Sequence, residues 1–213
     1  MPRAQPAVNE KTRLDSLQTP DESMEGDKAL MFRLIVLSVL LIGFSGCAFI
    51  DHHDKRQYPF KTTVPGSPPK AAVKVMVSTP LDNIVSKMRN NYGSETADIT
   101  VPHQRSEVIK FAVEQEFANR GYIVSGDAKN ALVIRVNQLE TELAQEDMKA
   151  GFFGACDVLV YLKTDKGVYE RNITAFNKVE SYVAVGPATG VDVFYNVVKQ
   201  CAEKISALAS EKL

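Results

Sequence analysis

The sequence predicts an α+β domain in which two helices pack on one face of an antiparallel β-sheet. Three observations support this class. Several segments alternate apolar and polar residues, two longer segments repeat apolar residues at three- and four-residue steps, and turn signals separate them. The strands and helices do not alternate regularly, so the expected order is β-α-β-β-β-β-α within a single domain, residues 70–213.

The first part of the domain is expected to hold one strand and one helix. Residues 71–78 alternate valines with mostly polar residues, which predicts a strand with one buried face. Residues 80–101 contain an Asn-Asn-Tyr-Gly turn signal and no clear period, so we expect a long surface excursion there. A helix follows near Pro102 and ends at Gly121, which is placed for a left-handed C-cap.

The second part is expected to hold four strands and the last helix. The strands are expected at residues 122–124, 131–138, 156–162 and 168–182. The acidic segment 140–149 is expected to form a loosely helical surface bridge between two of them. Thr189, with Asp192 three residues later, resembles a capping box and predicts where the last helix begins.

Ahead of the domain, an apolar stretch has the layout of a secretory signal peptide. Arg33 precedes eleven mostly apolar residues, 34–44, which are followed by Ser-Gly-Cys. This apolar core is too short to span a bilayer, which needs about 20 residues. Phe-Ser-Gly-Cys resembles the bacterial lipobox, so residues 31–46 are expected to be a lipoprotein signal peptide. By that resemblance a peptidase cuts before Cys47, which then carries lipid.

The segments on either side of the signal carry little pattern. Residues 1–30 are polar, proline-bearing and acidic, which indicates either a disordered extension or a misassigned start with translation beginning at Met31. Residues 47–69 combine the lipidated cysteine with a Pro-rich, extended tether. Within it, adjacent His52 and His53 lack the convergent geometry of a metal site, so we interpret them as solvated linker.

Composition and motifs give little support for catalysis or nucleic-acid binding. The net charge is -1 without a basic block, so no nucleic-acid partner is indicated. No metal-ligand spacing, phosphate-binding loop or Gly-x-Ser-x-Gly motif is present, and the lone His103 of the domain is expected on the surface. We therefore assign no catalytic residue, metal or cofactor. The alternative is an envelope hydrolase with an unrecognised site, for instance among the carboxylates of residues 140–147.

Adjacent Phe152 and Phe153 are the candidate partner contact. Neighbouring residues of a strand face opposite sides, so a single core buries at most one of them. The other either covers a helix edge or is exposed to dock a partner or touch lipid. The strand at 168–182, if it lies at the sheet edge, could also add a partner strand.

Cys156 and Cys201 are a candidate disulfide. Cys156 is expected on the inner face of its strand, and Cys201 lies in the apolar stripe of the last helix. Both thiols would then point into one layer in an oxidising compartment. The alternative is two buried, unpaired thiols that act as small apolar groups.

The order of these parts resembles the YajG-like bacterial lipoproteins. The resemblance rests on the lipobox, the Pro-rich tether, the Val-x-Val-x-Val strand, Asn119-Arg-Gly-Tyr-Ile-Val124, the strand triplet and the C-terminal helix. It implies an envelope lipoprotein without an established activity, so no catalytic residues carry over. Ala48 after the cysteine, by resemblance to known sorting, implies an outer-membrane location facing the periplasm. The expected partners are the membrane, through lipid on Cys47, and an unknown envelope protein.

Overall fold

The computed structural model describes residues 51–56, 69–89, 94–146, 149–182 and 185–213. All of them belong to one compact unit, residues 49–213. The predicted signal peptide, the segment 1–30, the lipidation site Cys47 and residues 57–68 of the predicted tether lie outside the described residues.

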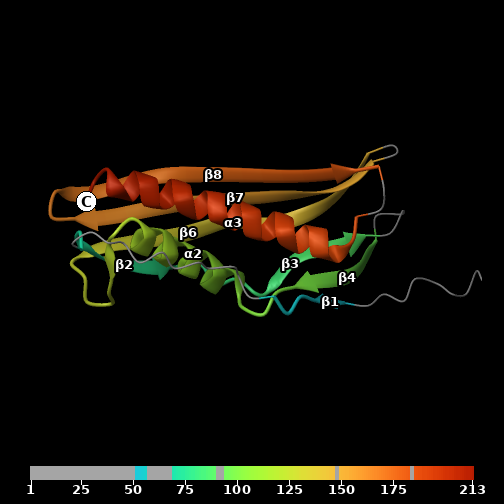
Figure 1. Ribbon diagram of the computed structural model, residues 1–213, viewed down its shortest axis with the longest axis horizontal. Coiled ribbons are helices and arrows are strands. Elements are labelled where there is room, and N and C mark those ends of the chain that lie inside the picture. The colour runs from blue at the N-terminus through green and yellow to red at the C-terminus, as the bar shows by residue number, and fades with distance from the viewer. Residues whose placement is uncertain (1–50, 57–68, 90–93, 147–148, 183–184) are drawn as a thin grey trace, which may run out of the picture. The chain divides into compact units, whose positions relative to one another are not determined.

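The described chain forms eight strands and two helices, drawn in Figure 1. They are β1 (His52–His53), β2 (Ala72–Val77), β3 (Ile84–Arg89), β4 (Glu95–Thr100), α2 (Arg105–Asn119), β5 (Ile123–Val124), β6 (Asn130–Glu146), β7 (Lys149–Thr164), β8 (Gly167–Ser181) and α3 (Pro187–Ser210). All seven predicted elements are present, as β2, α2, β5, β6, β7, β8 and α3. The α+β class is therefore confirmed.

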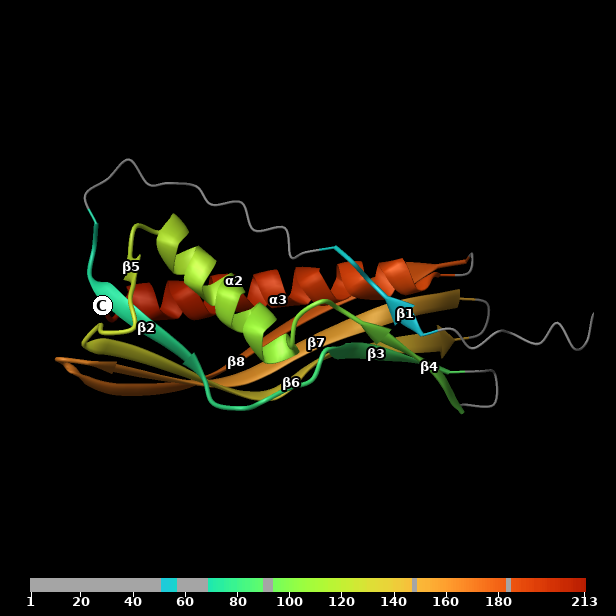
Figure 2. The same ribbon diagram turned by 90° about the horizontal axis from the view of Figure 1, so that it is seen from below.

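The main sheet has five strands in the order β5-β2-β6-β7-β8, and both helices cover the same face of it (Figure 2). The ladders β6–β7 and β7–β8 are antiparallel, but β2 runs parallel to both of its neighbours. The sheet is thus mixed rather than antiparallel throughout. The reason is the helix α2 between β2 and β5, because a helical crossover returns the chain to the end of the sheet at which β2 began.

The predicted surface excursion at 80–101 is wrong, because this segment forms β3 and β4. With β1 these strands build a second, three-stranded sheet in the order β1-β4-β3. Val85 and Ile99 are fully buried and join the core of the main sheet. The β3–β4 ladder is irregular at two places, near Ser86 and near Met88, and these irregularities interrupt the period-2 pattern that would have indicated strands.

The acidic segment after residue 139 is also extended, not loosely helical. β6 continues to Glu146 and stays paired with β7 throughout. The ladder shifts by one residue between Val136 and Gln138, so the inward positions change from even-numbered to odd-numbered residues. After this bulge Leu139 and Thr141 are buried, and Glu140 and Glu142 are exposed.

Helix α3 lies close on β7 because two glycines leave room for it. A Cβ at Gly190 would lie 2.8 Å from Cε1 of Phe152, and one at Gly154 would lie 2.8 Å from Cγ1 of Val193. No side chain fits at such separations without a shift of its neighbours. The helix begins at Pro187, with Gly186 as N-cap, so the predicted capping box lies inside the first turns rather than at the start.

The turn at the end of α2 follows the prediction. Gly121 has a φ of 85°, in the left-handed region where glycine carries no Cβ penalty. The backbone N–H of Tyr122 then donates to the carbonyl of Phe117 at 2.9 Å, and this bond closes the helix end. The aromatic rings of these two residues pack edge to face, 5.6 Å apart.

A disulfide joins Cys156 of β7 to Cys201 of α3 in the structure, with their Cα atoms 6.4 Å apart. Both residues are fully buried. The bond connects the middle of the sheet to the middle of the covering helix, 45 residues further along the chain.

We expect thiol titration of the denatured, unreduced mature protein to find neither cysteine free. The double variant Cys156→Ala/Cys201→Ala should lose up to about 4 kcal/mol of unfolding free energy, because the bond closes a loop of 45 residues. Under reducing conditions the wild type should lose most of this advantage, which separates the bond from the packing of the two side chains. Two titratable thiols per chain would rule the disulfide out.

Candidate functional site

Residues 51–56, which we call the N-terminal clasp, are fixed onto the folded domain. β1 pairs parallel with β4, with His52 opposite Ile99 and His53 opposite Thr100. The backbone N–H of Asp54 continues the ladder by donating to the carbonyl of Thr100 at 3.0 Å. This corrects the expectation of a solvated linker at His52-His53-Asp54.

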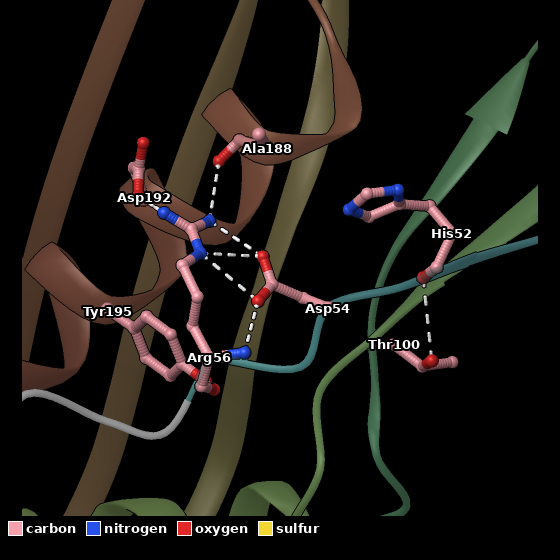
Figure 3. A network of polar contacts seen from close by, with 7 residues as sticks. All are labelled: His52, Asp54, Arg56, Thr100, Ala188, Asp192 and Tyr195. Atoms are coloured by element: carbon pink, nitrogen blue, oxygen red, sulfur yellow. Dashed lines mark hydrogen bonds and ion pairs between the residues drawn. The ribbon is translucent and has the colours of Figure 1, made fainter.

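Asp54 is the centre of the clasp (Figure 3). Its side chain is only 5% exposed and receives bonds from Arg56, from Nε at 2.9 Å, from Nη2 at 2.7 Å and from the backbone N–H at 2.7 Å. The same guanidinium reaches the first turns of α3, where Nη1 donates to Oδ1 of Asp192 at 2.7 Å and Nη2 to the carbonyl of Ala188 at 3.3 Å. The Tyr195 hydroxyl donates to the carbonyl of Arg56 at 3.0 Å.

The charges of the clasp hold each other in their ionised forms. The hydrogen bond from Arg56 holds the pKa of Asp54 below its usual value, although burial acts in the opposite direction. The pKa of Arg56 is raised in turn, first by its bond to Asp54 and then by Asp192. Burial raises the pKa of the Tyr195 hydroxyl, so it stays a neutral donor. The clasp is therefore closed by charge-assisted bonds at neutral pH.

The second candidate surface is the face of the main sheet that the helices leave uncovered. Phe152 is fully buried beneath α3, whereas Phe153 is 37% exposed on the opposite face. This confirms that the core takes only one of the two. Phe153 stacks on Phe176 of β8, which is 56% exposed, with ring centroids 5.8 Å apart. We call Phe153 and Phe176 the outer aromatic pair.

Sequence reasoning missed Phe176. A signal was present, because Ile173 and Ala175 alternate on the buried face and the next residue must therefore point outward. What the sequence lacked was the register that sets Phe176 diagonally beside Phe153 on the neighbouring strand.

Two of the cavities formed by the described residues lie away from these surfaces. One, of about 230 Å³, lies between β3 and β6 and is lined by Arg105, whose Nη1 donates to the carbonyl of Leu139 at 2.8 Å. The buried hydroxyl of Ser86 in its wall has no hydrogen-bond partner. The other, of about 380 Å³, lies between the end of α3 and the β7–β8 hairpin. His103 lies apart from both, 3.8 Å from a carboxylate oxygen of Glu107.

Within the described ranges, no three His, Cys, Asp or Glu side chains come together as they would to hold a metal ion. Glu140 and Glu142, two of the carboxylates considered for a hydrolase, are exposed on β6 beside the smaller cavity. Neither helix of the described chain is long and apolar enough to cross a membrane.

The described residues form a single α+β domain whose N-terminal segment is bound to the fold and whose main sheet is covered by helices on one face only. A family model described as uncharacterized lipoprotein matches residues 82–207, and the chain belongs to this family. The resemblance to the YajG-like lipoproteins is thereby confirmed. As a member of a lipoprotein family, the protein is lipid-anchored in the cell envelope. Among the curated proteins, none matches the sequence.

Solved structures are similar to this chain at low sequence identity. A protein from Xanthomonas campestris is 14% identical with a TM-score of 0.50, and the match covers 76% of this chain and 99% of that one. A minor lipoprotein from Acinetobacter baumannii is 11% identical with a TM-score of 0.44, covering 68% and 95%. The rare lipoprotein B from Shewanella oneidensis is 11% identical with a TM-score of 0.38, covering 66% and 96%.

We expect the clasp to open in acid. The folded pKa of Asp54 is lowered, so its contribution is fully present above the unfolded value near 3.8 and is lost as the pH falls through the folded pKa. A nitroxide label at the exposed Lys55 should therefore be ordered at pH 7 and gain mobility only below about pH 4. Electron paramagnetic resonance measures this directly.

Two carboxylate variants provide the matched comparison at pH 7. Asp54→Asn should free the label, because it removes the buried anion that Arg56 binds. Asp192→Asn should change little, since that side chain is 57% exposed and a surface ion pair contributes about 0–1 kcal/mol. A second label at Lys199 of α3 should stay ordered in both, which excludes global unfolding. A label at Lys55 as ordered in Asp54→Asn as in wild type would contradict the role of Asp54.

Proposed function

We propose that this lipoprotein is a non-catalytic binding or accessory module at the outer membrane, facing the periplasm, which presents the uncovered face of its sheet to an envelope protein. The observation that carries the proposal is the outer aromatic pair. Large aromatic side chains that lie together on an exposed face are typical of protein contact sites, where aromatics dominate the binding energy.

The small apolar area of the outer aromatic pair limits the binding free energy that it can contribute alone. The exposed fractions of Phe153 and Phe176, 37% and 56%, sum to about one whole phenylalanine. Covering roughly 200 Å² of aromatic surface contributes about 5 kcal/mol. Association costs about 4–15 kcal/mol of lost freedom, so the pair offsets at most the lower end of that cost. A partner must therefore also contact the polar rim around the pair, which favours a protein surface over a small ligand.

The clasp supports a membrane-proximal position for the domain. β1 begins five residues after Cys47, which allows at most about 18 Å of extended chain between the lipidated residue and the fold. A tether that ran freely to residue 69 would allow several times that reach. The clasp therefore restricts the domain to partners that lie close to the membrane surface.

We expect Cys47 to carry the lipid anchor. Cys47→Ser should leave an uncleaved precursor without lipid, because only the cysteine thiol accepts the diacylglyceryl group. Radiolabelled palmitate and the mass of the protein measure the two effects. Cys156→Ala/Cys201→Ala, which leaves Cys47 in place, is the control and should still incorporate palmitate. Unchanged labelling of Cys47→Ser would contradict the anchor.

We expect the outer aromatic pair to contact the partner. The photo-crosslinking residue p-benzoylphenylalanine at Phe176 should give one discrete adduct with an envelope protein in intact cells. The matched control is the same residue at Phe111 of α2, a phenylalanine that is also exposed, at 41%. Phe153→Ala should remove the Phe176 adduct, since it removes the stacked ring. Adducts of equal yield at both positions, or none at Phe176, would contradict the proposal.

A further inference from the structure

Strand β8 offers a long and regular free edge. It is the last strand of the main sheet (Figure 1) and pairs with β7 along all of its 15 residues without a register shift. No proline interrupts residues 167–181. Short strands, prolines, bulges and charged side chains are the usual protections of such edges, and β8 has only charged side chains among them. At the opposite margin of the sheet, β5 has only two residues and offers no comparable edge.

Most residues of this edge strand are exposed. In the middle of β8 the carbonyl of Thr174 accepts a bond of 2.7 Å from Nζ of Lys204, which reaches it from α3. The Lys204 ammonium group thus donates to a carbonyl that would accept a backbone N–H if another strand were paired with β8. A carbonyl oxygen has two lone pairs, so this bond does not prevent a second donor from approaching along the edge.

We infer that β8 pairs antiparallel with β8 of a second copy of this chain. Paired residues of an antiparallel ladder share a face, so only a limited set of registers keeps the buried and open faces continuous. The register with complete overlap pairs Gly167 with Ser181 and sets Thr174 opposite its own counterpart. The same register sets Glu170 opposite Lys178 of the second copy. The two-fold axis generates an identical second pair between Lys178 of the first copy and Glu170 of the second.

Neighbouring registers lose this complementarity. A shift of the second copy by two residues in one direction sets Glu170 opposite Glu180 of that copy, a like-charge pair that is unfavourable directly across a ladder. A shift in the other direction sets Lys178 opposite Val168 and Glu170 opposite Phe176. Lys178 already lies 2.6 Å from Glu180 within one chain, at 46% exposure, and can also face an added carboxylate. The register with the longest ladder is therefore also the one with the best charge pairing.

The symmetry of this dimer suits a lipid-anchored protein. The two-fold axis is perpendicular to the sheet, so the helix layers of both copies lie on the same side of a ten-stranded sheet. The clasp contacts α3, so both clasps lie on that side as well, and both anchors can enter one membrane. The outer aromatic pairs of the two copies lie on the other side, where a partner can reach them. The dimer is independent of the proposed partner contact, which uses the face of the sheet and not its edge.

Cysteine crosslinking tests the register in cell envelopes that contain the full-length protein. Opposed residues have Cα atoms about 4.5–5.5 Å apart, within the range of a disulfide. Thr174→Cys should therefore give a disulfide-linked dimer on non-reducing gels. Phe176→Cys, whose two copies would lie about 14 Å apart, should stay monomeric. Absence of the Thr174→Cys dimer, or equal crosslinking at both positions, would overturn the inference.

Charge reversal tests the pairing independently of crosslinking chemistry. In the Thr174→Cys background, Glu170→Lys should reduce dimer formation at least about tenfold, because two attractive pairs become repulsive. Lys178→Glu should do the same, and Glu170→Lys with Lys178→Glu should restore the dimer. Restoration shows that the loss in the single variants depends on the sign of the paired charges. Single variants that crosslink like their parent would overturn the inference.

Discussion

The packing of α3 against β7 is the contact on which the rest of the domain depends. The helix is the longest element of the core layer, and most of its apolar stripe is buried. Gly154 and Gly190 allow it to approach the sheet more closely than any side chain would permit at those positions. Because α3 and α2 both lie on one face, the opposite face of β6, β7 and β8 remains open to solvent. The exposure of the outer aromatic pair follows from this one-sided arrangement.

The clasp depends on the same helix in a different way. Asp54 is nearly fully buried, and a buried carboxylate is costly unless it is paired and hydrogen-bonded. Arg56 supplies both requirements, and its remaining donors reach α3. A pair of this kind adds little net stability over apolar residues of similar volume, but removal of one partner is costly. Its contribution is therefore to hold the N-terminal segment in one place on the domain.

The open side of the sheet combines two features that a solitary domain rarely leaves exposed. The outer aromatic pair places two phenylalanine rings in water, and β8 has no neighbouring strand on its outer edge. Each is costly to leave exposed, the first through apolar hydration and the second through its tendency to pair with other chains. Both features involve β8, and each carries one of our two proposals: an envelope partner for the outer aromatic pair and a second copy of this chain for the edge.

The sequence by itself determined the α+β class, both helices and the strands with regular alternation, as well as the inward direction of Cys156 and Cys201 and the burial of at most one of Phe152 and Phe153. These depend on local periodicity, which a chain carries in its own order of residues. Cys47 and its lipid also follow from a local motif and remain a prediction. The tertiary structure decided the rest. β3, β4 and the end of β6 escaped prediction because bulges shift the period. The parallel pairing of β2, the clasp between Asp54 and Asp192, and the stack of Phe153 on Phe176 depend on register and on contacts between residues far apart in the chain, and no local pattern encodes these.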